Sequence, residues 1–254
     1  MNRFQFYPKL ALKFFLSFVL VTIIGTQLHE LGHIAVAKML GYDTELHYDS
    51  MNYYHKGYTD DEDVKKAIDL YVQNEKTPYE DWNESVKQEH KELSDSIKSK
   101  FDFNEQHQLL IRLGGPVQTF LTSFLGLFIL NYRKSKHKTT FKIIDWIAVF
   151  MSLFILREVF NLVSALLYVI FFGNKQFYGD EFIISEGFGM NQWVVPIMAA
   201  VIGIMIAGYV LLKMIPNNLR FTFIVSGFFG GLLGFALWFG FLGSWVFSFW
   251  DQNF

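Results

Sequence analysis

Hydrophobic positions along the chain are grouped into five long runs, separated by shorter polar stretches. A run of about 18 or more residues with few charges predicts a membrane-spanning helix, because roughly 20 residues at 1.5 Å each cross the hydrocarbon of a bilayer. We expect a first span over residues 11–28, in a helix that continues to residue 40, where Gly41 favours a helix end. Further spans are expected at 109–130, 143–172, 193–212 and within 221–250.

One large polar region, residues 42–107, separates the first two spans. Within it, segments 60–74 and 78–100 have the periodicity of amphipathic helices. The whole pattern predicts an all-α membrane protein: a polytopic helical bundle of about five transmembrane helices with one polar, helical loop region. We divide the chain into 1–41 with the first transmembrane helix, 42–107 as the polar loop region, and 108–254 as the remaining transmembrane bundle.

The last hydrophobic run contains four glycines, Gly227, Gly230, Gly231 and Gly234. Small residues on a membrane helix allow another helix to approach closely. A glycine-rich span without a specific partner is an equally good interpretation, so the sequence leaves both open.

The amino-acid composition limits which residues can bind a metal and which partners are expected. The chain has no cysteine, which excludes disulfides and thiolate metal sites, so any metal must be held by histidines and carboxylates. The formal net charge of -2 argues against nucleic acid as a partner. The expected partners are the lipid bilayer and a membrane-protein or peptide substrate.

Loop charges predict an orientation. The loop after the second span carries basic residues over 133–142 with no acid among them, and Lys213 and Arg220 follow the fourth span. The acidic region 42–107 and the loop 173–191 fall on the opposite side. By the positive-inside rule, we expect a multi-pass protein of the cell (plasma) membrane with its N-terminus in the cytoplasm.

The sequence His29-Glu30-Leu31-Gly32-His33 ends the first span. Two histidines four residues apart stack on one face of a helix, so both imidazoles can reach one metal ion. Zinc lowers the pKa of bound water, and a neighbouring carboxylate such as Glu30 can take the proton during attack on a carbonyl. Ionisable groups at the end of a hydrophobic helix are costly, which favours a functional role. The motif therefore predicts a zinc (Zn2+) site with His29 and His33 as ligands and Glu30 as the catalytic base.

Two histidines and a water leave a catalytic zinc site one protein ligand short. If the first span ends outside, the third ligand should lie near the outer ends of the spans. The loop after the third span supplies Asp180, which we prefer, and Glu181. His107, at the outer start of the second span, is a further candidate.

The third span carries Arg157, Glu158 and Asn161 within an apolar run. Such side chains must face protein or water, and Arg157 and Glu158, as neighbours in sequence, do not face each other on a helix. We expect each to find a partner on another span, with Arg112 as a candidate for Glu158. Asn161 is predicted either to bind the backbone of an extended substrate or to tie helices together.

At these positions the chain resembles the intramembrane site-2 metalloprotease family. The first match is residues 26–33, TQLHELGH, followed by the small residues Ala35 and Ala37. The second is Leu113-Gly114-Gly115-Pro116, which is similar to the Gly-Pro element of the family, with Thr119 near the place of an asparagine that often follows it. Asn161 and Asp180 give a weaker third match.

The resemblance implies a zinc metalloendopeptidase that cuts peptide bonds within or beside the bilayer, with His29, His33 and Asp180 as ligands and Glu30 as base. Two alternatives stay open. One is a membrane metallopeptidase of another lineage that acts outside the bilayer, which Glu181 as third ligand would favour. The other is a non-catalytic metal-binding or scaffold membrane protein.

Overall fold

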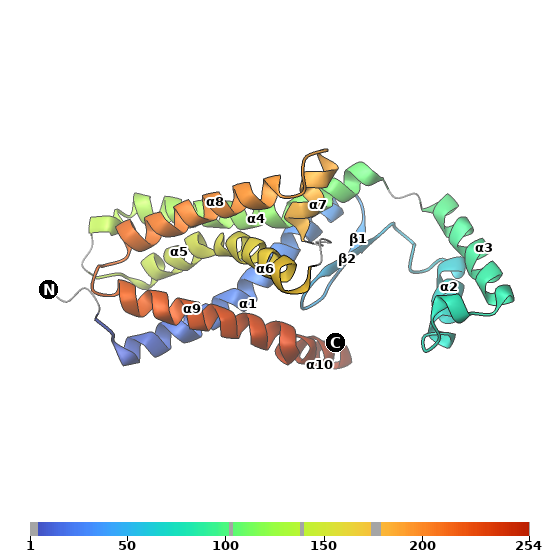
Figure 1. Ribbon diagram of the computed structural model, residues 1–254, viewed down its shortest axis with the longest axis horizontal. Helices are drawn as coiled ribbons and strands as arrows, with labels where there is room; N and C mark the ends of the chain where they lie inside the picture. Colours follow the sequence, from blue (N-terminus) through green and yellow to red (C-terminus); the bar gives the residue numbers. More distant parts are fainter. Residues whose placement is uncertain (1–4, 102–103, 138–139, 174–178, 254) are drawn as a thin grey trace.

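The chain folds as an elongated helical bundle with a small polar lobe at one end, as seen in a computed structural model that describes residues 5–101, 104–137, 140–173 and 179–253 (Figure 1). Residues 1–4, and 174–178 of the expected 173–191 loop, lie outside the described residues. The helices and strands are α1 (Pro8–Met39), β1 (Asp43–Leu46), β2 (Met51–Tyr54), α2 (Glu62–Gln73), α3 (Glu84–Lys100), α4 (Glu105–Tyr132), α5 (Ile143–Leu153), α6 (Leu156–Phe172), α7 (Asp180–Gly187), α8 (Val194–Tyr209), α9 (Arg220–Leu237) and α10 (Gly243–Asn253). Short π-helical turns, Val210–Met214 and Trp238–Leu242, extend α8 and join α9 to α10.

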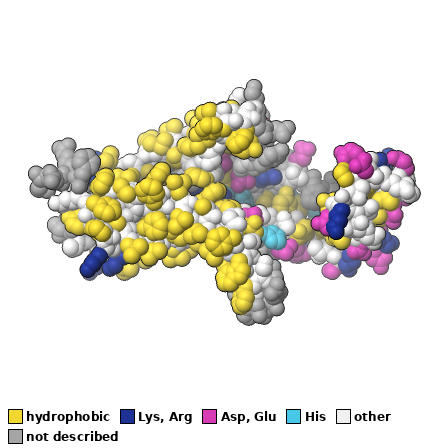
Figure 2. All heavy atoms as spheres, turned by 60° about the horizontal axis from the view of Figure 1, so that its bottom comes forward, with side chains coloured by type: hydrophobic (Ala, Val, Ile, Leu, Met, Phe, Trp, Pro, Cys, Tyr) yellow, Lys and Arg dark blue, Asp and Glu magenta, His cyan; other side chains and the backbone are white. Residues whose placement is uncertain are grey.

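Five helical segments in the described part of the chain are long and apolar enough to cross a membrane: Pro8–Met39, Glu105–Tyr132, Ile143–Phe172, Val194–Met214 and Arg220–Phe249. The prediction of an all-α bundle of five transmembrane helices is confirmed, and the protein is a multi-pass membrane protein. Figure 2 shows apolar side chains covering the bundle, while acidic and basic side chains gather on the lobe at the far end. Such a division is typical of a bundle in lipid and a lobe in water.

Helix α1 packs along both α4 and α9 (Figure 1). Its contact with α9 uses three of the four glycines of the last span. A Cβ on Gly230 would lie 2.6 Å from the Phe15 carbonyl oxygen, and one on Gly234 would lie 3.0 Å from Val19 Cα. A Cβ on Gly227 would meet the Phe18 ring at 2.8 Å, whereas Gly231 faces open space. Of the two interpretations, the close helix contact is therefore the correct one for Gly227, Gly230 and Gly234.

The third span is interrupted between α5 and α6, at Phe154 and Ile155. Ser123 of α4 lies at this break. Its hydroxyl donates to the Met151 carbonyl oxygen at 3.3 Å and accepts from the Ile155 amide at 3.0 Å. These bonds satisfy backbone groups that a broken helix would otherwise leave unpaired in an apolar bundle. The break sets Arg157 and Glu158 in the first turn of α6.

The polar region 42–107 differs in part from its prediction as helical. It begins with β1 and β2, which pair antiparallel with Asp43 opposite Tyr54. The connecting turn is fixed from two sides, because Gln27 Nε2 and Trp238 Nε1 both donate to the Tyr48 carbonyl oxygen, at 2.7 Å and 2.6 Å. Strands of four residues carry little sequence signal, so these long-range bonds decide the local structure.

The rest of this region contains the two amphipathic helices that the sequence predicts. Helices α2 and α3 lie side by side beyond the end of the bundle and form the outer lobe, residues 62–100 (Figure 1). Asp61 and Asn83 cap their N-termini through side-chain oxygens. The predicted helices at 60–74 and 78–100 are thus confirmed, with α3 beginning somewhat later, at Glu84.

Candidate metal centre

The two motif histidines lie on one face of α1, near the end of the bundle that carries the hairpin. His29 is fully buried and His33 nearly so, and their ring centroids are 4.9 Å apart. Helix α1 continues past them to Met39 and ends where Gly41 takes a φ of +91°. The predicted helix through the motif and its stop at Gly41 are both confirmed.

Helix α4 approaches the motif more closely than side chains would allow. The Gly114 carbonyl oxygen occupies the place that a Cβ on Gly32 would need, and a Cβ on Gly114 would lie 2.9 Å from His33 Cα. A Cβ on Gly115 would lie 2.5 Å from His29 Nε2. The glycines therefore bring the backbone of α4 into contact with both histidines.

This contact fixes the proton on each imidazole. His33 Nδ1 lies 2.8 Å from the Ile111 carbonyl oxygen, which can only accept, so Nδ1 carries the hydrogen. The Gly115 amide also lies 3.2 Å from this Nδ1. We assign the hydrogen to Nδ1 because its contact with the Ile111 carbonyl oxygen is the shorter of the two. His29 Nδ1 lies 3.0 Å from the Thr119 hydroxyl, which itself donates to the Gly115 carbonyl oxygen at 3.2 Å and therefore accepts from His29. Both Nε2 atoms are left with free lone pairs, as in metal-binding histidines.

Asp180, at the start of α7, completes the group. Its Oδ2 lies 3.2 Å from His29 Nε2 and 3.2 Å from His33 Nε2. Three lone-pair donors thus converge from α1 and α7, although Asp180 lies far from the motif in sequence.

The spacing of these donors fits a metal ion. A tetrahedron with bonds of about 2.0–2.1 Å has edges of about 3.3–3.4 Å, close to the separation of Asp180 Oδ2 from each Nε2. The ligand atoms of His29, Glu30 and His33 also lie within 4.8 Å of one another, so Glu30 is a second candidate for the third ligand. We prefer Asp180 to Glu30 as the third ligand, because its distances match the tetrahedral edge. Glu30 lines the same cavity as His33 and Asp180.

Other candidates from the sequence lie elsewhere. Glu181 turns away from the histidines, and its Oε1 accepts from Asn161 Nδ2 at 3.1 Å. Asn161 thereby ties α6 to α7, and it also lines the cavity described below, so its role in substrate binding stays a prediction. His107 lies 3.0 Å from the Tyr42 hydroxyl through Nδ1 and takes no part in the group.

Of the two charged residues of the third span, Arg157 finds a partner on another span, as predicted, whereas Glu158 has no ion-pair or hydrogen-bond partner among the described residues. Arg157 Nη2 lies 3.8 Å from Glu30 Oε1, whereas Glu158 is buried beside Glu181. The proposed Arg112–Glu158 pair is wrong, because Arg112 Nη1 lies 3.5 Å from Asp180 Oδ1 instead. Both oxygens of Glu158 lack a hydrogen-bond donor within the described ranges.

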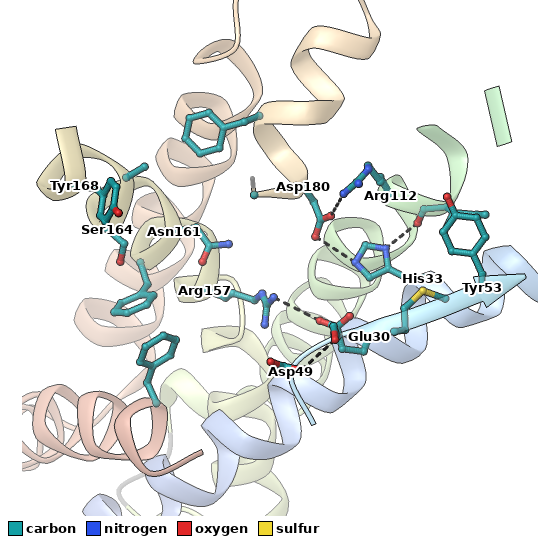
Figure 3. A pocket seen from close by; sticks show the side chains of 18 residues that line it. Glu30, His33, Asp49, Tyr53, Arg112, Arg157, Asn161, Ser164, Tyr168 and Asp180 are labelled. Atoms are coloured by element: carbon teal, nitrogen blue, oxygen red, sulfur yellow. Dashed lines mark hydrogen bonds and ion pairs between the residues drawn. The ribbon is translucent and has the colours of Figure 1, made fainter. Parts of the chain in front are cut away.

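The histidine–aspartate group opens on a cavity of about 670 Å³ (Figure 3). Strand β2 forms one wall through Met51 and Tyr53, and α6 forms another through Asn161 and Arg157. Figure 3 shows Asp180, His33 and Glu30 at the base of this cavity, with Arg112 and Arg157 on either side. The sequence did not predict the hairpin, and although it pointed to Arg157 it did not predict that this side chain would lie beside Glu30. The sequence signal for Arg157 was its positive charge within the apolar run 143–172.

No protein-family model matches this chain. Comparison with curated proteins and with solved structures likewise gives no match. The function is therefore inferred from the sequence motif and from the geometry and chemistry of the site.

Proposed function

We propose that this protein is a membrane-embedded zinc metallopeptidase that cleaves peptide bonds of membrane proteins. One observation carries the proposal: Asp180 Oδ2 lies 3.2 Å from both His29 Nε2 and His33 Nε2, beside Glu30, at a cavity near the end of a membrane helix. Two imidazoles and a carboxylate, with no cysteine in the chain, are a donor set that suits a catalytic zinc ion with an open position. The resemblance of the motif to site-2 metalloproteases supports the same function.

The chemistry assigned to the chain's own residues is general base catalysis. A bound zinc ion supplies an acidified water and polarises the substrate carbonyl. Glu30 takes one proton from the water while the water oxygen bonds to the carbonyl carbon. The C–N bond then breaks, and Glu30 returns that proton to the leaving nitrogen, which gives a carboxylic acid and an amine. Thr119 and the Ile111 carbonyl hold the two imidazoles in position throughout.

The surroundings of the site favour an unwound peptide as substrate. A helix in lipid hides its amide bonds, so it must open locally before attack. Strand β2 borders the cavity, and within the described residues it pairs only with β1, so no strand occupies its other edge. An extended peptide could add to that edge, with Asn161 on the facing wall as a binding residue.

The proposed orientation places the N-terminus in the cytoplasm, as the loop charges predict. His29 is then roughly 30 Å along α1 from Pro8, at 1.5 Å per residue, which is about the thickness of the hydrocarbon. The site would thus lie near the outer surface of the membrane, on the side of the outer lobe.

Cleavage of membrane peptides by purified protein tests the proposal, with Glu30→Gln as the decisive variant. We expect the variant to retain zinc and to lose at least about 100-fold in kcat, the lower range for a general base. Glu186→Gln, on the exposed face of α7, serves as the matched control and should cleave like the unaltered protein. Equal cleavage by the Glu30 variant would rule out the assigned mechanism.

Metal analysis separates the alternatives. A non-catalytic metal-binding protein would hold zinc through His29 but show no cleavage that depends on Glu30. A metallopeptidase acting outside the bilayer is less well supported, because Glu181 bonds to Asn161 rather than facing the histidines. Zinc retained in full after His29→Ala would argue against any role of this group.

A further inference from the structure

Arg157 occupies a position that the stability of the membrane helix does not explain. It lies in the first turn of α6, within a span of high hydropathy. A cation is costly in such a span, and the positive end of the helix dipole at the first turn disfavours it further. The hairpin, the loops and the water-exposed lobe offer less costly places for an arginine. The reason for a positive charge at position 157 must therefore lie in the groups that the Arg157 side chain contacts.

Arg157 faces the cavity from the wall opposite strand β2, next to Glu30 (Figure 3). Its Nη2 lies 3.8 Å from Glu30 Oε1, which is an ion pair but too long for a hydrogen bond. Its Nε is buried and has no acceptor within the described residues. A guanidinium has five N–H donors in a fixed plane, so Glu30 leaves donors available for another oxygen.

We propose that Arg157 is a catalytic residue that binds the carbonyl oxygen of the scissile peptide bond and stabilises the negative charge that develops on it. This inference rests on the proposed peptidase function. Glu30 must lie beside the attacking water, so a guanidinium 3.8 Å from Glu30 reaches the neighbouring carbonyl. As water attacks, the π electrons of the C=O bond move to that oxygen, and an oriented cation there lowers the barrier.

The other arginine of the cavity is less suited to this role. Arg112 Nη1 lies 3.5 Å from Asp180 Oδ1, and Figure 3 shows Arg112 on the other side of His33 from Glu30. Its side chain is also more exposed than that of Arg157, at 44% against 28%, so water screens its charge more. The two arginines thus have separate tasks: Arg112 orients a predicted ligand, and Arg157 serves the reacting carbonyl.

A binding measurement tests this without turnover. A phosphinic peptide has an anionic tetrahedral group in place of the scissile amide, so it resembles the charge that Arg157 is proposed to stabilise. We expect Arg157→Met to bind such a peptide about 100-fold more weakly than the unaltered protein does, with zinc content and thermal unfolding unchanged. Lys98→Met removes a long basic side chain from the exposed face of α3 and should bind normally.

A second measurement distinguishes catalysis from a structural role. In Arg157→Ala, kcat should fall about 100–1,000-fold with KM little changed, and added guanidinium ion should restore part of it. Equal phosphinic-peptide binding by Arg157→Met and the unaltered protein would overturn the inference alone, as would loss of zinc in parallel with activity. Failure of the unaltered protein both to cleave and to bind the phosphinic peptide would overturn it together with the proposed function.

Discussion

The contact between α1 and α4 and the outer lobe are held together by opposite means. In the first, Gly32, Gly114 and Gly115 let two backbones touch, and the histidines are fixed by backbone and hydroxyl groups. In the outer lobe, α2 and α3 are tied by exposed charges: Lys100 Nζ lies 2.8 Å from Asp61 Oδ2 and 2.9 Å from Asp63 Oδ2. The lobe also contains few buried apolar side chains, with Val64 and Leu70 the buried residues of α2.

This difference shows where the molecule needs precision. The proposed metal site would tolerate displacements of only about 0.5 Å, and backbone contacts between α1 and α4 supply supports of that rigidity. Exposed ion pairs contribute little stability and are screened by salt, so they suit a lobe whose exact position the centre does not require. Changes at the centre should therefore have large and specific effects, and changes in the lobe should have small and local ones.

The largest effect is expected at the third predicted ligand. Asp180→Asn removes the charge between the two histidines, so we expect zinc affinity to fall by more than about 100-fold, beyond the range of outer hydrogen-bond partners. Glu181→Gln, one residue along, is the matched variant and should keep most of the affinity, because Glu181 faces Asn161. Competition titration with a zinc chelator measures both. The reverse order of affinities would identify Glu181 as the ligand.

Next is the helix contact itself. Gly114→Ala places a Cβ against the backbone of Gly32 and His33, and overpacking of this kind costs about 1–3 kcal/mol despite the higher helix propensity of alanine. Gly231→Ala, where a Cβ meets open space, should be neutral or slightly stabilising. Thermal unfolding in detergent compares the two. Equal melting temperatures would mean that the α1–α4 contact is not rigid.

A smaller effect is expected from Thr119, which supports His29. Thr119→Val keeps the shape of the side chain but removes the acceptor for His29 Nδ1, so zinc affinity should fall about tenfold. Thr122→Val, one turn along on the partly exposed face of α4, is the control and should leave zinc affinity unchanged. Affinity unaffected by Thr119→Val would show that the Thr119 hydroxyl does not orient the imidazole.

The smallest effect belongs to the outer lobe and depends on pH. Hydrogen bonds from Lys100, and from Ser96 to Asp63, lower the pKa of Asp61 and Asp63, and the same pairs raise the pKa of Lys100. Because a lowered carboxyl pKa stabilises the fold only above the unfolded value, this contribution is lost as pH falls below about 3.8 through the folded values. Hydrogen exchange in α2 should then quicken, while exchange in α1 stays slow.

Lys100→Met should speed exchange in α2 already at neutral pH and should reduce its further change on acidification. Lys98→Met, which removes a neighbouring lysine on the same helix, should not. If acidification opened α1 and α2 together, the two regions would unfold as one unit, and the contrast between them would fail.

The sequence by itself determined the five membrane spans and the pairing of His29 with His33. Both depend on features of a single segment. About 20 apolar residues in a row are long enough to cross a bilayer, and two residues four apart lie on the same face of a helix. The same local periodicity predicted α2 and α3. Each of these features can be read from one stretch of chain, because the helix that produces it satisfies its own backbone.

Only the tertiary structure decided which side chains join the motif. Asp180 meets the histidines, Arg157 meets Glu30, and the Tyr48 carbonyl fixes the hairpin, each across a long separation in sequence. No local pattern distinguishes Asp180 from Glu181. The choice follows from the start of α7 and from the glycine contacts that set the distance between α1 and α4. Those contacts are decided by packing in three dimensions, where a single Cβ would exclude the arrangement.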